Sequence, residues 1–237
     1  MRKSTPEEIE ARFDADVERF SDLAGGQATI PDSALAQDLL VAVAARHNPE
    51  PASILDLGCG AGNLTLRLLA AFETPPARIC LVDLSAPMLA RAAERVHAEG
   101  FIGALEIVKG DLRDVDLGSG HDFIATAAAL HHLRGEAEWR AAFARLHTAL
   151  RPGGLLLVHD MIATGIPAAA ETIRARYGEH LTALRDEAYR DHVFAYIERE
   201  DTPESLADQI VWLREAGFAS VDVLHARDGF AVYVAVA

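Results

Sequence analysis

The chain has 237 residues, of which 50% are hydrophobic and 24% charged, and its formal net charge is −14 at pH 7. This composition is typical of a globular protein, and the acidic balance argues against nucleic acid as a partner, since phosphates attract clustered Lys and Arg. The longest apolar runs, such as Phe123–Leu130, are too short to span a membrane. No signal peptide is evident. We therefore expect a cytoplasmic protein without a membrane partner, and the two cysteines, Cys59 and Cys80, fit a reducing compartment.

In chain order, the first predicted elements are two helices within residues 7–47, separated by Leu23-Ala24-Gly25-Gly26. From residue 53 onward, short apolar runs alternate with longer helical stretches. The expected strands are Ile54–Leu57, Arg78–Val82, Ala104–Val108, Phe123–Thr126 and Leu155–His159. The expected helices are Gly62–Phe72, Ala86–Glu99 and Glu136–Leu150, the last ended by Arg151-Pro152-Gly153-Gly154. Such alternation predicts parallel strands joined by crossover helices that cover both faces of a sheet.

The end of the chain breaks this rhythm. Residues 166–200 predict a helical insertion, which the helix Pro203–Ala216 follows. Two strands, Ser220–His225 and Phe230–Val236, then flank an Asp-Gly pair, which is typical of a hairpin turn. We expect a single α/β domain over residues 1–237. Its parts would be an N-terminal helical segment (1–50), a core (51–160), a helical cap insertion (161–202), and a closing helix with a strand hairpin (203–237).

A glycine-rich turn follows the first predicted strand and contains Asp56, Gly58, Gly60 and Gly62. Glycines at a strand-to-helix turn let the backbone approach a ligand closely. A dinucleotide site has the spacing G-x-G-x-x-G, but here the third glycine comes one residue early and Asn63 stands in the expected position. The carboxylate of Asp56 suits a cationic ligand better than a pyrophosphate. An ordinary tight turn is the alternative.

Carboxylates also follow the next two predicted strands. Asp83 comes 25 residues after Gly58. This is close to the ~20-residue separation between the glycine-rich turn and the acidic residue that binds ribose hydroxyls in such folds. The alternative is that Asp83 caps the next helix, a role that Ser85 also offers. Asp111 follows the third strand and is placed to bind an adenine, or else is a solvated loop residue. Because open parallel sheets bind ligands at the carboxyl edge of their strands, these groups together predict a site there.

The D-x-G-x-G-x-G turn, the Asp83 strand end, Gly110-Asp111, residues 122–133 and Leu150-Arg151-Pro152-Gly153-Gly154 together resemble the class I (Rossmann-like) S-adenosylmethionine-dependent methyltransferase family, over residues 50–160. The resemblance implies a seven-stranded, mostly parallel sheet with helices on both faces, an antiparallel last strand, N-terminal helices and a late helical cap. It also implies S-adenosylmethionine as cofactor. The residues that it assigns to cofactor binding are Asp56, Gly58, Gly60 and Gly62 at the methionine, Asp83 at the ribose, Asp111 and Leu112 at the adenine, and also Leu84, Met88 and Ala127.

The flanks resemble a narrower branch. Phe13-Asp14 and the segment Trp212–Phe218 are similar to the branch that includes carboxy-S-adenosylmethionine synthase. That enzyme adds a carboxylate to the cofactor and holds it with an arginine of the late helical segment. Counting back from Gly217-Phe218 places this position at Phe194, and Arg190 lies one turn away. A synthase-like enzyme and a non-catalytic cofactor-binding subunit are therefore alternatives to a methyltransferase, and the glycine spacing disfavours a nicotinamide oxidoreductase.

Methyl transfer needs an aligned acceptor and the exclusion of water, and it needs a general base only when the acceptor must lose a proton. The candidates for a catalytic role are His131 and His132, after the fourth strand, and His159, at the end of the fifth. The alternative for each is a structural hydrogen bond. Side chains of the insertion are the candidates for acceptor binding, and they are Tyr177, Tyr189, Arg190 and Tyr196.

The ten histidines do not show the i, i+4 pairing or the Cys/His spacing of familiar metal sites, so no metal ion is expected. The sequence thus predicts a methyltransferase that acts on a small-molecule acceptor by direct in-line transfer. Nucleic acid is not expected as a partner. A homodimer is left open.

Overall fold

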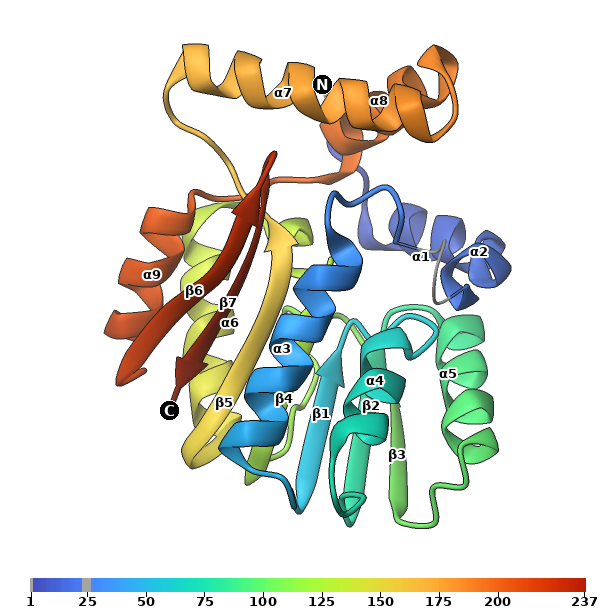
Figure 1. Ribbon diagram of the computed structural model, residues 1–237, viewed down its shortest axis with the longest axis vertical. Coiled ribbons are helices and arrows are strands. Elements are labelled where there is room, and N and C mark those ends of the chain that lie inside the picture. Colours follow the sequence, from blue (N-terminus) through green and yellow to red (C-terminus); the bar gives the residue numbers. More distant parts are fainter. Residues whose placement is uncertain (1, 23–26) are drawn as a thin grey trace.

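The computed structural model describes residues 2–22 and 27–237 (Figure 1). The predicted helix break at residues 23–26 lies outside this part of the chain. The helices are α1 (Pro6–Ala15), α2 (Val17–Ser21), α3 (Ser33–His47), α4 (Asn63–Ala71), α5 (Ala86–Ala98), α6 (Gly135–Ala149), α7 (Pro167–Leu184), α8 (Glu187–Glu200) and α9 (Leu206–Glu215), with a short 3-10 helix η1 (Leu130–His132). The strands are β1 (Ser53–Leu57), β2 (Arg78–Asp83), β3 (Ala104–Lys109), β4 (His121–Ala127), β5 (Leu150–Met161), β6 (Ser220–Arg227) and β7 (Phe230–Val236).

These seven strands form one sheet in the order β3-β2-β1-β4-β5-β7-β6. Strands β1 to β5 are parallel, and β7 is antiparallel to both β5 and β6. The expected antiparallel last strand is therefore confirmed. Asp228 and Gly229 both have positive φ angles, 45° and 89°, in the tight turn between β6 and β7. This is the conformation that an Asp-Gly hairpin requires.

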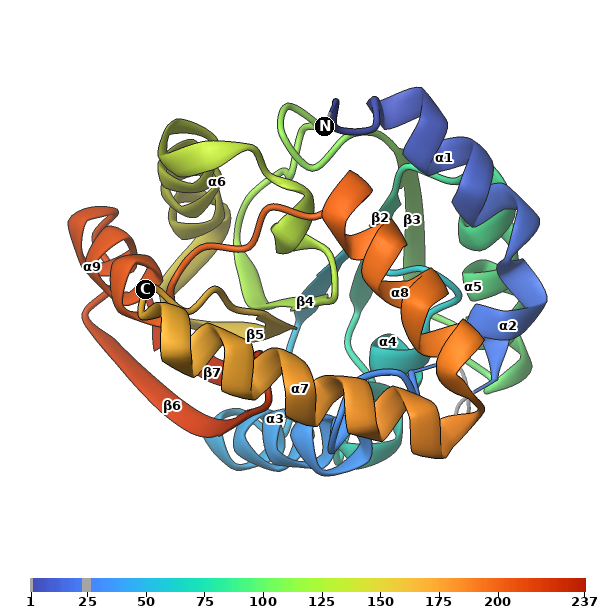
Figure 2. The same ribbon diagram turned by 90° about the horizontal axis from the view of Figure 1, so that it is seen from above.

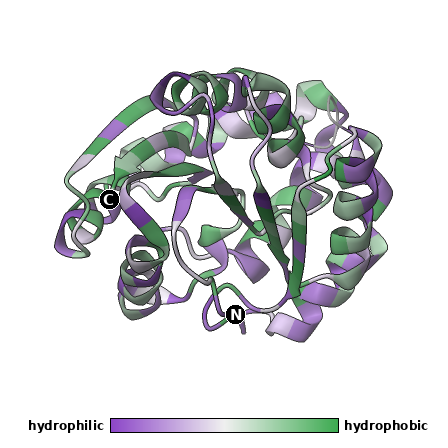
Figure 3. Cartoon of the chain, turned by 90° about the horizontal axis from the view of Figure 1, so that it is seen from below, coloured by the Kyte–Doolittle hydropathy of each residue, from purple (hydrophilic) through white to green (hydrophobic). Residues whose placement is uncertain are grey.

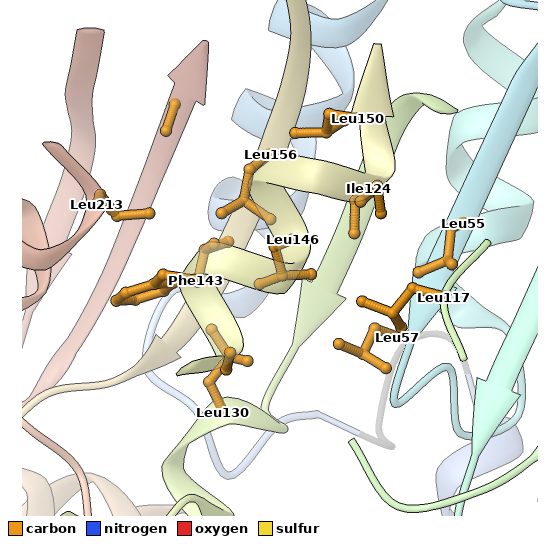
Figure 4. Packing of buried hydrophobic residues seen from close by; sticks show 14 of the residues in the cluster. Leu55, Leu57, Leu117, Ile124, Leu130, Phe143, Leu146, Leu150, Leu156 and Leu213 are labelled. Atoms are coloured by element: carbon orange, nitrogen blue, oxygen red, sulfur yellow. The ribbon is translucent and has the colours of Figure 1, made fainter. Parts of the chain in front are cut away.

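Alternate residues of the central strands face two helical layers, because successive side chains of a strand point to opposite sides. Leu155 and Leu157 pack with residues of α3 and α4, whereas Leu156 and Val158 pack with residues of α6 and α9. Figure 4 shows side chains of the hydrophobic cluster that contains Leu156, with Leu146 of α6 among them. The helices around the sheet carry both apolar and polar segments (Figure 3). Burial on both faces is why these strands appear as apolar runs in the sequence.

Helices α7 and α8, here called the cap helices, cross above the carboxyl ends of the parallel strands (Figures 1 and 2). Their apolar side chains form a small cluster of their own, in which Tyr177, Leu181 and Val193 meet Ile30 and Phe230. The cap helices therefore lie over the edge of the sheet where the glycine-rich turn was expected to bind a ligand.

The observed elements differ from the expected ones in several places. Helix α9 begins at Leu206 rather than at Pro203, and Ser205 caps it. Residues 7–47 contain three helices rather than two within the described chain, and β5 begins at Leu150 instead of Leu155. The Pro-Gly-Gly segment joins the strand because Gly153 N–H donates to the Ala237 carbonyl and Ala237 N–H donates to the Gly154 carbonyl. Among the helices of the described chain, none combines the length and the apolar character needed to cross a membrane.

Candidate cofactor and acceptor site

A cavity of about 420 Å³ lies at the carboxyl edge of the sheet. Its floor comes from the glycine loop (residues 58–62) and from the ends of β1, β2, β3 and β4. Its other walls come from α1 and α2 on one side and from the cap helices above. The cavity therefore extends from the predicted cofactor residues to the predicted acceptor residues.

The glycine loop borders this cavity with two of its three glycines, Gly58 and Gly60. Gly60 has a φ of +49°, and a Cβ added there would meet no atom within 4 Å, so it would enter open space. A Cβ on Gly58 would lie 2.5 Å from the Cβ of Ala129. Gly62 does not border the cavity, because it precedes α4 and faces Ala92 of α5. The predicted direct contact of Gly62 with the cofactor is therefore not supported, and Gly62 instead allows close packing of α4 against α5.

The carboxylate of Asp83 is held by the backbone on both sides. Its Oδ2 accepts the N–H of Gly60 at 2.8 Å, and its Oδ1 accepts the N–H of Ser85 at 2.9 Å. Ser85 itself caps α5 by accepting from the N–H of Met88, so Asp83 is not the helix cap. Asp83 borders the cavity, and burial raises its pKa. Each oxygen keeps a second lone pair for a ligand.

Asp56 borders the cavity from the end of β1. The hydroxyl of Thr65 donates to its Oδ2 at 2.5 Å. Burial raises the pKa of Asp56 to about 6, against the opposing effect of the Thr65 hydrogen bond, and the nearby Asp83 charge adds to the rise. A cationic ligand group beside Asp56 would favour the ionised carboxylate.

Asp111 forms a bidentate ion pair with Arg113, whose Nε and Nη2 donate to its two oxygens at 2.8 and 2.6 Å. Burial raises the pKa of Asp111, but the hydrogen bonds from Arg113 outweigh it, so the net shift is downward. Asp111 and Leu112 both border the cavity. The remaining predicted cofactor residues that border it are Leu84, Met88 and Ala127.

His131 and His132 border the cavity on the side of η1. The Nδ1–H of His131 donates to Asp160 Oδ1 at 2.5 Å, and Asp201 Oδ1 lies 3.7 Å from its Nε2. Burial lowers the pKa of His131, but the charges of Asp160 and Asp201 reverse this effect and raise it to about 9. Burial lowers the pKa of His132, whose Nδ1 lies 3.4 Å from Asp201 Oδ1.

His159 does not border the cavity, although it adjoins Asp160 on β5. It is buried, and burial lowers its pKa to about 4. Adjacent strand residues point to opposite faces, so Asp160 reaches His131 while His159 faces the other way. The catalytic role considered for His159 is therefore not supported by its position.

The underside of the cap contributes the three predicted tyrosines, Tyr177, Tyr189 and Tyr196. Arg190 does not border the cavity, because its guanidinium lies outside near Asp191 and Glu187. The position of Arg190 therefore does not support the predicted contact between Arg190 and the acceptor.

The position that the synthase branch would fill with arginine is Phe194. Its ring packs against Tyr177 at 5.8 Å between centroids, with the Arg174 guanidinium 4.0 Å from it. Phe194 does not border the main cavity. Neither Phe194 nor Arg190 thus supplies a cation to the cavity.

Several residues that border the cavity were not among the predicted site residues. They are Arg12, Arg19 and Phe20 of α1 and α2, and His192 and Arg199 of α8. Phe13 was noted only as part of a resemblance, and its ring packs edge-on against His132 at 6.0 Å. Arg199 lies nine residues, or about two and a half turns, after Arg190 on α8. The two side chains therefore lie on opposite faces of the helix, and Arg199 borders the cavity.

Comparison with known proteins agrees with this geometry. Residues 54–154 match a family described as a methyltransferase domain. The carboxy-S-adenosyl-L-methionine synthase of Chromohalobacter salexigens is 32% identical, over 98% of this chain and 86% of that protein. The chain belongs to the class I S-adenosylmethionine-dependent methyltransferase family. Its cofactor is S-adenosylmethionine. The open space at Gly60 and the two oxygens of Asp83, each of which can accept a further hydrogen bond, fit this cofactor.

Other relatives and solved structures are consistent with family membership. The enzyme of the same name from Aeromonas hydrophila is 28% identical, over 82% of this chain and 78% of that protein. Magnesium protoporphyrin IX methyltransferase from Synechocystis PCC 6803 with bound SAH has a TM-score of 0.66 at 18% identity, covering 98% of both chains. Mitomycin 7-O-methyltransferase MmcR has a TM-score of 0.62 at 19% identity, and the match covers 99% of this chain but 61% of that one. The two structures share the fold.

Proposed function

We propose that this enzyme transfers the methyl group of S-adenosylmethionine to a small-molecule acceptor bound beneath the cap helices. One cavity supports this proposal, because it joins the glycine loop to the tyrosines of the cap without an intervening wall. A shared cavity lets the two substrates be aligned and screened from water, which supplies much of the acceleration when one substrate is already activated.

The cofactor end of the site is proposed residue by residue. Asp83 would accept hydrogen bonds from the ribose hydroxyls, and Asp111 with Leu112 would contact the adenine. Asp56, Gly58 and Gly60 would face the methionine moiety. The remaining contacts would come from Leu84, Met88 and Ala127. When bound, the cofactor supplies a methyl group on a sulfonium, which is transferred to the acceptor by in-line displacement.

The acceptor end combines tyrosines with cations. Burial raises the pKa values of the Tyr177 and Tyr196 phenols well above their usual range, so both are neutral hydrogen-bonding groups rather than bases. Arg12, Arg19 and Arg199 border the same cavity, and the guanidinium groups of Arg12 and Arg199 are both paired with Glu200. We infer that the acceptor is an aromatic or acidic small molecule, since such a compound matches apolar rings with a few directed cations.

The experiment incubates the purified enzyme and deuteromethyl-labelled S-adenosylmethionine with a small-molecule extract, followed by mass spectrometry. We expect label in a low-molecular-weight compound, and much less label with the Asp83→Ala variant. Label in the macromolecular fraction would contradict a small acceptor. Intact cofactor binding with no labelled compound in any extract would instead favour a non-catalytic cofactor-binding subunit.

A synthase-like reaction is a second candidate, because curated relatives at 32% and 28% identity carry the name carboxy-S-adenosyl-L-methionine synthase. Arg199 supports it, since an arginine of the late helical segment does border the cavity. The positions of Phe194 and Arg190 argue against it. Mass spectrometry of the nucleoside that co-purifies with the protein separates the two, because a carboxylated cofactor is heavier by one carboxylate.

We also propose that the chain works as a single cytoplasmic domain in which residues 161–202 close the site. The free thiols of Cys59 and Cys80 suit a reducing compartment. A homodimer is compatible with this arrangement and is tested by light scattering.

No binding to tRNA or duplex DNA is expected, because the net charge of −14 opposes it. Salt-sensitive retention of tRNA on a filter would contradict this.

A further inference from the structure

Three side chains that are far apart in the sequence converge at the acceptor end of the cavity. They are His131 and His132 of η1 and Asp201, which follows α8 directly. Backbone contacts bring the two segments together, because Thr202 N–H donates to the His131 carbonyl at 2.8 Å. One ligand atom from each side chain lies within 4.8 Å of the other two. We call these residues the His-His-Asp cluster.

The cluster contains buried polar atoms without hydrogen-bond partners. Both ring nitrogens of His132 and both carboxylate oxygens of Asp201 are in this state. The side chain of Asp201 has no exposed surface, and that of His132 is 9% exposed. Buried polar atoms without partners are costly, and a cluster of them in a native protein points to a missing ligand, water or ion.

His131 has the hydrogen bond that is usual for a metal ligand. Its Nδ1–H donates to Asp160, which leaves Nε2 directed toward Asp201. Asp160 is itself fixed, because its Oδ2 accepts the N–H groups of Ala129 and Leu130 at 3.1 and 2.7 Å. A carboxylate that orients a histidine in this way recurs in metal sites and raises the basicity of the ligand.

The charges point in the same direction. Within residues 2–22 and 27–237, the ion pairs of the Asp160 and Asp201 carboxylates are with imidazole rings alone. Neither carboxylate thus forms an ion pair with Lys or Arg in this part of the chain, although the charge of Arg12 acts on the cluster from farther away. A divalent cation at the cluster would pair with Asp201 directly and with Asp160 through the ring of His131.

We propose that the His-His-Asp cluster binds one divalent transition-metal ion through His131 Nε2, His132 Nδ1 and Asp201 Oδ1. The separations of 3.7 and 3.4 Å between Asp201 Oδ1 and the two nitrogens match two bonds of about 2.1 Å at a tetrahedral angle, which span roughly 3.4 Å. Two imidazoles and one carboxylate suit Zn²⁺, Fe²⁺ or Co²⁺ better than Mg²⁺ or Ca²⁺. Any proton on His131 Nε2 or His132 Nδ1 leaves to solvent when the ion binds.

The ion would face the cavity, because two of its three ligands, His131 and His132, border the cavity, whereas Asp201 does not. Three protein ligands leave at least one position of a tetrahedral ion open. That position is available to an oxygen of the acceptor or to water. Metal binding itself does not depend on which group the enzyme transfers.

The test uses the full chain, treated with a chelator, dialysed, and titrated with Co²⁺ as the probe. We expect visible d–d absorption that saturates at one Co²⁺ per chain and disappears when Zn²⁺ is added. A titration without a saturating band at one equivalent would overturn the proposal, and this outcome needs no variant.

Variants then locate the site. Asp201→Asn is expected to weaken Co²⁺ binding at least a hundredfold, and Asp160→Asn is expected to weaken it tenfold to a hundredfold through the orientation of His131. The matched control is His97→Ala, an exposed histidine of α5, which should bind Co²⁺ as the wild type does. Far-UV circular dichroism checks that each variant folds. Unchanged Co²⁺ affinity in a folded Asp201→Asn variant would contradict the assigned ligands.

Discussion

The backbone N–H of Gly60 donates to Asp83 Oδ2 at 2.8 Å, which links the glycine loop after β1 to the end of the neighbouring strand β2. This bond holds the carboxylate and the glycine loop in a fixed relation before any ligand arrives. A site that is already ordered loses less conformational entropy on binding. The Gly60–Asp83 bond is therefore the relation on which we expect cofactor affinity to depend most.

We predict that Asp83→Ala weakens the binding of S-adenosylhomocysteine, the demethylated product of the cofactor, by about 1.5–3 kcal/mol. This is the range for a hydrogen bond to a charged group, and it corresponds to a loss of roughly tenfold to 150-fold in affinity. Isothermal calorimetry measures it. The control is Asp114→Ala, an exposed acid near Asp111, which should leave the affinity unchanged. Wild-type affinity in the Asp83 variant would remove Asp83 from the cofactor site.

Two glycine substitutions should separate binding from stability. Gly60→Ala places a methyl group in the open cavity at a positive φ, so it should abolish measurable cofactor binding and cost about 1–2 kcal/mol of stability. Gly58→Ala adds a collision with Ala129 at 2.5 Å and should cost about 2–4 kcal/mol. Thermal unfolding and calorimetry measure the two effects. Normal cofactor affinity in Gly60→Ala would be inconsistent with a cofactor at this loop.

Cofactor affinity should depend on pH through Asp56, whose pKa burial raises to about 6. Below that pH the free protein carries a neutral Asp56, and a cationic ligand group must first ionise it. Affinity for S-adenosylhomocysteine should therefore fall by up to about tenfold per pH unit below pH 6. The pKa of Asp83 is also raised by burial, so Asp56→Asn should show a shallower fall rather than none. Identical pH profiles for the two proteins would argue against a cation at Asp56.

Asp122 should stabilise the folded chain far from the site. Burial raises its pKa, but hydrogen bonds from Ser53 N–H, Arg151 and Ala52 N–H outweigh this and lower it. Its stabilisation is therefore complete above the unfolded pKa, near 4, and is lost as pH falls through the lower folded pKa. Asp122→Ala should cost about 2–4 kcal/mol at pH 7, since it leaves buried donors unpaired. Urea unfolding at pH 7 and pH 3 measures it, and equal stability losses at both pH values would contradict this account.

The cap helices should become more protected when the cofactor site is filled. The cap helices make apolar contacts with few residues outside the cap, Ile30 and Phe230 among them. Tyr196 and Ile197 of the cap border the cavity, so a bound ligand would add contacts to them. We expect hydrogen exchange across residues 170–200 to slow in the presence of S-adenosylhomocysteine, while α9 is unaffected. Equal protection with and without the ligand would mean that the cap is a fixed wall.

The sequence alone determined the α/β core and the cofactor edge. Parallel strands buried on both faces appear as apolar runs, and a ligand-binding turn needs glycines such as Gly60, so both leave local signals. The carboxylates of Asp83 and Asp111 could be singled out because Asp83 ends β2 and Asp111 comes two residues after β3. Local spacing was sufficient for these features.

Only the tertiary structure decided which side chains reach the acceptor. Asp201 meets His131 through the way the segment after α8 packs against η1, a contact between residues 70 positions apart that no local spacing encodes. The rotation of α8 places Arg199 at the cavity and Arg190 away from it, beside Asp191, and the pleat of β5 separates Asp160 from His159. Helix rotation and strand register depend on packing against distant elements, and for that reason the acceptor end could not be derived from the sequence.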